Sequence, residues 1–281
     1  TKWIGMANED IPNVLSALTD LTRFQTIADR TQQSMLNFIF LGRAMTRGFT
    51  RHEAFQDDDG APLIDTRAQL TFDGNSQGGI MGGALTAVSP DIRRAVLGVP
   101  GMNYSTLLNR SADFPPFEQV LNAAYPDKLD QQIAFGLIQM LWDRGEANGY
   151  AQHMTDRPLP RTPSHKVLMH VAFGDHQVAP VAAEVEARTI GARIHWPAVR
   201  PGRLPDKVPY WGIAPIRSYP YKGSALVIWD SGAPVPPLTN TPPTEGTDPH
   251  SHPRSNPDAR RQKAVFLSTG RIIDVCGGGP C

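Results

Sequence analysis

Apolar and polar positions along the chain predict strands and helices that follow one another in turn. Four segments have the length and apolar content of strands: 68–72, 94–100, 166–173 and 225–229. Helical spacing of apolar residues predicts a helical first part at residues 8–46. The same spacing predicts four further helices, at 117–124, 129–144, 180–190 and 257–268. Strands that alternate with helices predict the α/β class, with a mostly parallel sheet flanked by helices on both faces.

The stretch 102–163 interrupts this alternation with helices alone and has the size of a helical cap inserted into the domain. In its second helix, Ile133, Leu137, Met140 and Leu141 share one face. We expect most of these apolar residues to belong to the core. The length of 281 residues and the single alternating pattern predict one domain over residues 1–281 that includes this insertion.

The strand predicted at 68–72 runs into the sequence Gly-x-Ser-x-Gly at residues 74–78, and a glycine- and alanine-rich helix follows. Strand, Gly-x-Ser-x-Gly and helix together are typical of a nucleophile elbow, which exposes the hydroxyl of Ser76 at a sharp turn. Glycine fits at the two outer positions because the chain approaches itself there. The helix N-terminus and the Gln77 N–H favour a developing oxyanion. A glycine-rich loop with a chance serine is the alternative.

A serine nucleophile needs a base to take its proton and a carboxylate to orient that base. Asp175 follows the strand at 166–173 and is the best candidate for the acid, although it also fits a helix N-cap. Asp230 ends the strand at 225–229 and is the reserve. The base is expected in the loop that holds His250 and His252, of which at most one belongs to a triad. Ser, Asp and His thus all follow strands, and ligand sites of parallel sheets lie at those ends.

In three segments the chain resembles the α/β-hydrolase superfamily, most of all the bacterial secreted esterase- or lipase-like enzymes: 74–78, 173–178 and 248–250. The resemblance covers most of the chain after about Ala68 and places the elbow strand fifth in that fold. It implies that Asp175 follows the seventh strand and that His250, after Asp-Pro, is the base behind the eighth. It implies hydrolysis of a small-molecule or lipid carboxylic ester through an acyl-enzyme on Ser76, without a cofactor or metal.

One part of the family pattern is missing before the elbow, namely a loop of the His-Gly-Gly type that supplies an oxyanion-hole N–H. Gln77 supplies one donor only. We therefore expect an N-terminal polypeptide that contributes the first strands and the second donor, either as a separate chain cut from the same precursor or as a preceding segment that this sequence does not include. On this hypothesis the strand at 68–72 pairs on one side with strands outside residues 1–281.

The composition limits the kinds of partner and the cellular compartment that we expect for this protein. The formal net charge is zero, so no nucleic acid is expected, and no apolar run reaches the roughly 20 residues of a membrane span. Cys276 and Cys281, the only two cysteines, close a short glycine-rich loop and are expected to form a disulfide, which favours a secreted or periplasmic protein. Free thiols and a two-cysteine metal site are the alternatives.

Three other functions compete with ester hydrolysis. An amidase or peptidase of the same fold has the same residues and differs in leaving-group protonation and pocket shape. An N-terminal nucleophile hydrolase uses a terminal threonine, and the chain starts at Thr1. A hydrolase-like binding module is expected to lack part of the triad, whereas here all three residue types occur in order.

Overall fold

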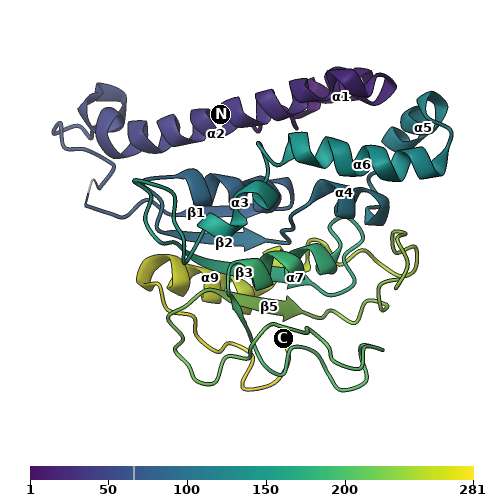
Figure 1. The fold of residues 1–281 in the computed structure, drawn as a ribbon. Helices are drawn as coiled ribbons and strands as arrows, with labels where there is room; N and C mark the ends of the chain where they lie inside the picture. Colours follow the sequence, from purple (N-terminus) through teal and green to yellow (C-terminus); the bar gives the residue numbers. More distant parts are fainter. Residues whose placement is uncertain (66) are drawn as a thin grey trace.

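The sheet is the centre of the computed structural model, which describes residues 1–65 and 67–281. Its five strands are all parallel, in the order β1-β2-β3-β5-β4. They are β1 (Phe72–Asn75), β2 (Arg94–Gly98), β3 (Lys166–Ala172), β4 (Arg193–Ile194) and β5 (Ala225–Trp229). The predicted α/β class and parallel sheet are confirmed, and the arrows of β2 and β5 point the same way in Figure 1.

Strand β1 begins later than the sequence predicts. Residues 68–71 lie in turn and coil, and the ladder starts at Phe72 opposite Ala95. It then continues through Gly74 and Asn75, which the sequence places in the turn. The register places Thr71 opposite Arg94, the first residue of β2, so residues 68–70 lie before the start of that strand and have no β2 neighbour to pair with. Thr66, in the same stretch, lies outside the described residues.

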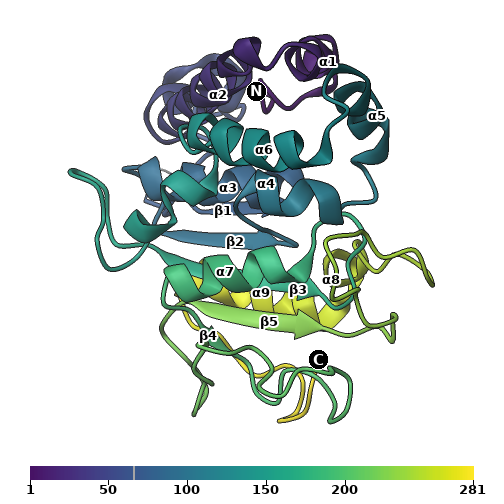
Figure 2. The same ribbon diagram turned by 45° about the vertical axis from the view of Figure 1, so that its right-hand side comes forward.

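Helices cover both faces of the sheet. On one face lie α3 (Gln77–Val88) and α7 (Pro180–Thr189), and on the other lies α9 (Pro257–Thr269) (Figures 1 and 2). Alternation along β3 explains the two layers: Val167 and Met169 pack in the cluster that includes α7, whereas Leu168 packs in the cluster that includes Phe266 of α9. Burial on both faces explains why the strands are continuous apolar runs.

A second helical layer stands above the β1 edge (Figure 1). It contains α1 (Ile11–Thr19), α2 (Gln25–Arg43), α4 (Tyr104–Leu107), α5 (Pro115–Ala124) and α6 (Lys128–Trp142). The helical stretch predicted at 8–46 is divided at Asp20, which has extended φ and ψ and caps a short turn through Thr22. Helices α4, α5 and α6 form the insertion between β2 and β3; its role as a cap stays a prediction.

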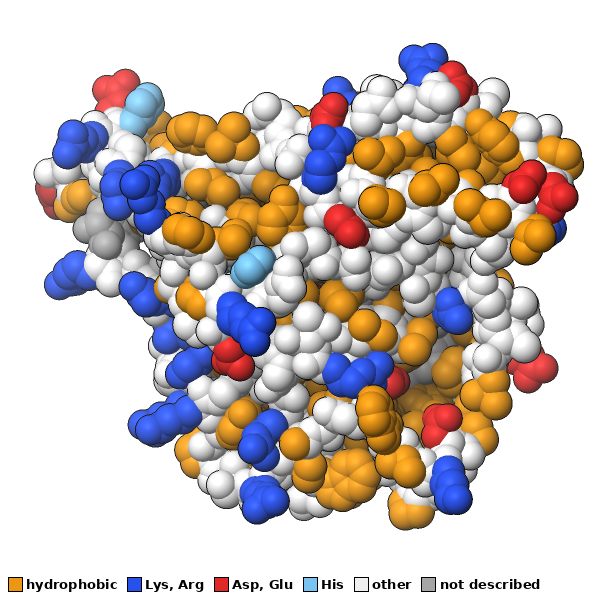
Figure 3. All heavy atoms as spheres, in the orientation of Figure 1, with side chains coloured by type: hydrophobic (Ala, Val, Ile, Leu, Met, Phe, Trp, Pro, Cys, Tyr) orange, Lys and Arg blue, Asp and Glu red, His pale blue; other side chains and the backbone are white. Residues whose placement is uncertain are grey.

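The prediction of which face of α6 lies in the core is wrong. Ile133, Leu137 and Met140 are 60%, 61% and 71% exposed, and Leu129 joins them in a stripe on the outer surface. The buried face carries Phe135, Ile138 and Trp142 instead. Apolar side chains gather over this part of the surface in Figure 3. Both faces of α6 are apolar, so spacing alone does not tell which one is buried.

The chain after β3 is less regular. Residues 195–224 connect β4 to β5 without a helix or strand, and the short α8 (His252–Ser255) precedes α9. Cys276 and Cys281 form the predicted disulfide, with Cα atoms 5.3 Å apart. Within residues 1–65 and 67–281, no helix combines the length and apolarity needed to cross a membrane.

Candidate active site

Three side chains predicted from the sequence meet beyond the carboxyl ends of the strands. Ser76 follows β1, Asp175 follows β3, and His250 lies in the loop between β5 and α8. His250 Nδ1 is 2.9 Å from both carboxylate oxygens of Asp175, and His250 Nε2 is 2.8 Å from Ser76 Oγ. With its proton on Nδ1, the ring donates to Asp175 and accepts from the serine hydroxyl.

The backbone of Ser76 is held in a conformation that few residues other than glycine adopt. Its φ is 58° and its ψ is −124°, and its N–H donates to the Gly98 carbonyl at 2.9 Å. A Cβ added to Gly74 would overlap the Gly78 carbonyl, so the turn closes only with glycine at that position. The turn places the Ser76 hydroxyl within reach of the imidazole, and this strain at a functional side chain is typical of an elbow.

The first turn of α3 lies against Ser76 and supplies a donor. The N–H of Gln77 has no acceptor among the residues that the structure describes, as expected of the first residue of a helix. Its side chain is engaged elsewhere, since Nε2 donates to the Tyr104 hydroxyl at 2.9 Å. Tyr104 is buried and stacks on Trp142 of α6, with ring centroids 4.4 Å apart. The backbone N–H is therefore free for an anion next to Ser76.

Asp175 makes contacts of two kinds, one within its own loop and one with His250. The carboxylate is buried, and Oδ1 accepts from the backbone N–H groups of Gln177 and Val178 at 2.9 and 3.0 Å. The same carboxylate bonds to the ring of His250. The backbone bonds orient the carboxylate toward His250. The alternative of a helix N-cap is wrong, because α7 begins after Ala179 without a side-chain cap and Asp175 holds the turn before it.

Asp248 joins the two loops that carry Asp175 and His250, and the sequence analysis assigned it no role. Its Oδ1 accepts from the backbone N–H groups of His250 and His176, at 3.0 and 3.2 Å, and its Oδ2 accepts from Gln177 Nε2 at 2.7 Å. Burial alone would raise the pKa of Asp248, but these hydrogen bonds outweigh burial and lower it. Two of these three bonds come from residues more than 70 positions earlier in the chain, so no local pattern around Asp248 predicts its role.

The two reserve residues lie outside this network. Asp230 forms a bidentate pair with Arg203, with nitrogen-to-oxygen distances of 2.7 and 2.8 Å. Burial acts to raise the pKa of Asp230, but the bonds from Arg203 and Gly232 prevail and lower it. His252 begins α8, and within the described chain its ring bonds to neither Ser76 nor Asp175. Of these two histidines, His250 is therefore the one that contacts Ser76 and Asp175.

Asp113 is a further carboxylate near His250 that the sequence analysis did not single out. Burial raises the pKa of Asp113; His250 opposes this rise, and Asp248 and Asp175 add to it. Its N–H donates to Ser111 Oγ at 3.2 Å, which fixes the turn before α5. Its only signal in the sequence is an acidic residue within the insertion, which is too common to be informative.

The C-terminal loop places a histidine beside the two cysteines. In the described part of the chain, His195, Cys276 and Cys281 form the one group of potential ligands close enough to hold a metal. Both sulfurs are joined in the disulfide and are not thiolates, which metal binding requires. The His195 ring instead lies 2.8 Å from the Gly279 carbonyl and 2.6 Å from the Tyr219 hydroxyl, and it holds the loop in place.

Comparison of the chain with protein-family models, with curated proteins and with solved structures finds no match.

Proposed function

We propose that this protein is a serine hydrolase that cleaves carboxylic esters through an acyl-enzyme on Ser76. The observation that supports it is the continuous set of bonds from Asp175 through His250 to Ser76 Oγ, with the serine on a strained strand-to-helix turn. Each bond joins atoms that must exchange or hold a proton in nucleophilic catalysis.

The first half of the proposed reaction acylates the enzyme. Ser76 Oγ attacks the ester carbonyl carbon while its proton passes to His250 Nε2, and the imidazolium that forms is stabilised by Asp175. The carbonyl oxygen becomes an oxyanion next to the Gln77 N–H at the N-terminus of α3. The intermediate then expels the alcohol, which takes the proton from His250 Nε2.

The second half releases the acid. A water molecule gives a proton to His250 Nε2 and attacks the acyl carbon, and the collapse of this second intermediate returns the proton to Ser76 Oγ. No cofactor takes part in either half of this proposal.

We propose the α/β-hydrolase fold for the same chain. Its support is the place of each residue in the sheet: the serine follows β1, the acid follows β3 and the histidine follows β5, and β1, β2, β3 and β5 are successive neighbours. The disulfide supports the proposal of a secreted or periplasmic protein, because disulfides persist in oxidising compartments.

The outer edge of β1 supports the proposal of a further polypeptide. Among the described residues β1 pairs with β2 alone, and Gln77 offers one backbone donor to an oxyanion. A second polypeptide that adds a strand along β1 would satisfy the free backbone groups and bring another donor. Native and denaturing mass spectra of the protein from its source test this. A second, different chain in the native complex, or one chain longer than residues 1–281, supports the proposal, and a lone chain with the mass of residues 1–281 contradicts it.

Labelling with a fluorophosphonate probe tests the proposed nucleophile. We expect one adduct on Ser76, and we expect Ser76→Ala to lose the adduct and to lower hydrolysis of a p-nitrophenyl ester by about 10⁴–10⁶. Ser268→Ala is the matched control, because its exposed hydroxyl only bonds within α9. An adduct that survives in folded Ser76→Ala would contradict the assignment.

A further inference from the structure

A cavity of about 450 Å³ lies beside the triad but does not contain the nucleophile. Asp175 lines its inner end, whereas Ser76 and His250 do not line it. Its walls are α7, residues 204–211 and residues 235–243, and its floor is at the carboxyl ends of β3 and β5. The cavity is thus a separate space behind the acid of the triad.

Most of the cavity wall is apolar or aromatic. Phe173 forms part of the floor, Val181 comes from α7, and Leu204 and Leu238 come from the two loops. Leu238 is 79% exposed and Trp211, on the rim, is 73% exposed. Large apolar side chains that stay this exposed around a hollow are typical of a binding site for an apolar body.

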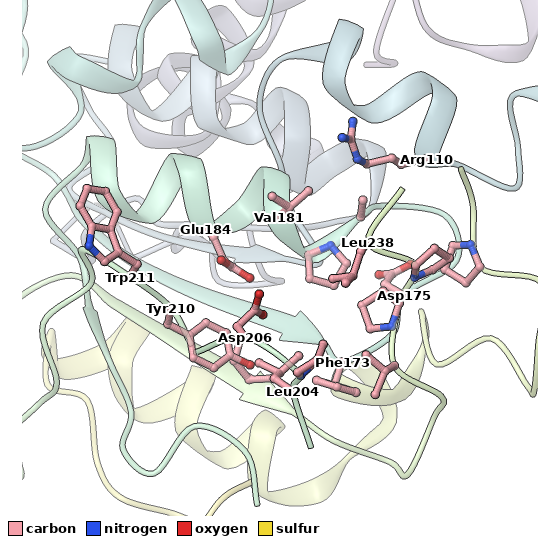
Figure 4. Close-up of a pocket in the computed structure, with 18 of the residues that line it drawn as sticks. Arg110, Phe173, Asp175, Val181, Glu184, Leu204, Asp206, Tyr210, Trp211 and Leu238 are labelled. Carbon is pink, nitrogen blue, oxygen red and sulfur yellow. The ribbon is translucent and has the colours of Figure 1, made fainter. Parts of the chain in front are cut away.

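One end of the cavity carries two carboxylates. Glu184 of α7 and Asp206 of the facing loop point toward each other in Figure 4, with Tyr210 and Trp211 at the same end. Asp206 has no hydrogen bond or ion pair within the part of the chain that the structure describes. Two like charges across a small space repel each other unless a cation lies between them.

The nearby arginines only partly balance this charge. Arg188 NH1 is 3.8 Å from Glu184 and donates to the Trp211 carbonyl at 3.2 Å. Arg203 is taken up by its bidentate pair with Asp230. Burial raises the pKa of Glu184 to about 7; Arg188 opposes this rise and Asp206 adds to it. A bound cation would restore the ionised form of this carboxyl group.

We infer that this cavity binds an organic ammonium ion with an apolar body. The ammonium group lies between Glu184 and Asp206, at the end of the cavity that Tyr210 and Trp211 also line, and aromatic rings attract a cation. The apolar body lies along Val181, Leu204 and Leu238. The occupant follows from charge complementarity at the end with Glu184 and Asp206 and from the apolar side chains along the walls. Arg110 also lines the cavity, away from the two carboxylates, and does not balance their charge. The site is independent of the proposed hydrolase activity.

Isothermal titration with three probes of equal length tests the charge preference. Hexylammonium, 1-hexanol and hexanoate share the apolar body and differ in the head group, and at pH 8 Glu184 is mostly ionised. We expect hexylammonium to bind at least about tenfold more tightly than hexanol, the change that one charged hydrogen bond provides. Hexanoate is expected to bind most weakly. Equal affinities, or no saturable binding of hexylammonium, would overturn the inference.

Substitutions decide whether binding takes place in this cavity. The double variant Glu184→Gln with Asp206→Asn is expected to remove the tenfold preference while hexanol binding changes less than twofold. Glu118→Gln with Asp130→Asn is the matched control, since both lie in the helical layer away from the cavity. Ser76→Ala is expected to bind hexylammonium as the wild type does. If the control pair removes the preference, or if Glu184→Gln alone, with an unchanged melting temperature, leaves it intact, the assignment fails.

Discussion

The two halves of the candidate site are built by different means. The nucleophile half comes from adjacent residues: β1 ends at Asn75, Ser76 turns, and α3 begins at Gln77. The acid–base half joins loops 75 residues apart in sequence, and Asp248, in the His250 loop, accepts two hydrogen bonds from the Asp175 loop. A local turn leaves its signature in a short motif, whereas a site made of distant loops depends on contacts that no short motif records.

The largest expected effect is the difference in ester turnover between substitutions of His250 and of His252. His250→Ala is expected to lower ester turnover by about 10⁵–10⁶, close to the loss in Ser76→Ala, because the two side chains act as a unit. His252→Ala is the matched control and is expected to keep turnover within about threefold, since its ring is not bonded to the triad. The kcat of both variants on one p-nitrophenyl ester decides. A dead His252→Ala together with an active His250→Ala would reverse the assignment of the base.

The acid gives the next largest effect. Asp175→Asn is expected to lower kcat by about 10³–10⁴, because the amide no longer fixes the tautomer of His250 that accepts the serine proton. Asp230→Asn removes a carboxylate of similar position from a pair with Arg203 and is expected to leave kcat nearly unchanged. If Asp230→Asn loses as much activity as Asp175→Asn, the contacts of Asp175 are not enough to assign it as the acid of the triad.

Local patterns predicted the parts of the molecule that local physics determines. The parallel sheet, the ends of α7 and α9 to within a residue or two, and the Cys276–Cys281 disulfide all follow from apolar runs, helix spacing and the separation of two cysteines. The choice between His250 and His252 came from a resemblance, and the contacts of the ring now distinguish them. The role of Asp248 depends on loop packing and leaves no such pattern.

Tertiary context explains what the sequence missed. The start of β1 was predicted four residues early because its partner strand β2 sets the register. The stripe with Ile133 and Leu137 was predicted to be buried, but α6 turns its other apolar face to the core. In both places the local pattern fits two arrangements, and only a neighbouring element selects one of them.

Two glycine-to-alanine substitutions, one in the elbow and one in the insertion, are expected to change the free energy of unfolding in opposite directions. Gly74→Ala is expected to destabilise the fold by up to about 3 kcal/mol, because its Cβ meets the Gly78 carbonyl and the Phe72 ring. Gly136→Ala, on the open surface of α6, is expected to stabilise it by about 0.5–1 kcal/mol, since nothing lies near its Cβ and alanine favours a helix. Urea unfolding measures both. A Gly74→Ala variant as stable as Gly136→Ala would mean that the elbow is not tightly closed.

The smallest expected effect concerns a buried carboxyl group between α7 and α3. Neither oxygen of Glu186 has a hydrogen-bond partner among the described residues, and the side chain is fully buried. Burial, with a further contribution from the charge of Glu146, raises the pKa of Glu186 to about 8. The folded state therefore holds this proton more tightly than the unfolded state does. Its contribution to stability is fully present below pH 4.5 and is lost as the pH rises through 8.

Glu186→Gln mimics the protonated form at every pH and tests this direction. Relative to the wild type, we expect the variant to gain on the order of 1–2 kcal/mol between pH 5 and pH 8.5, since the wild type alone must ionise a buried carboxyl group. The amide adds a donor without a partner, which lowers the stability of the variant by the same amount at both pH values. Glu245→Gln, in an exposed loop, is the control and is expected to show no such gain. Urea unfolding at the two pH values measures the difference. If the stability of the variant relative to the wild type falls as the pH rises, Glu186 has a cationic or hydrogen-bonding partner in solution.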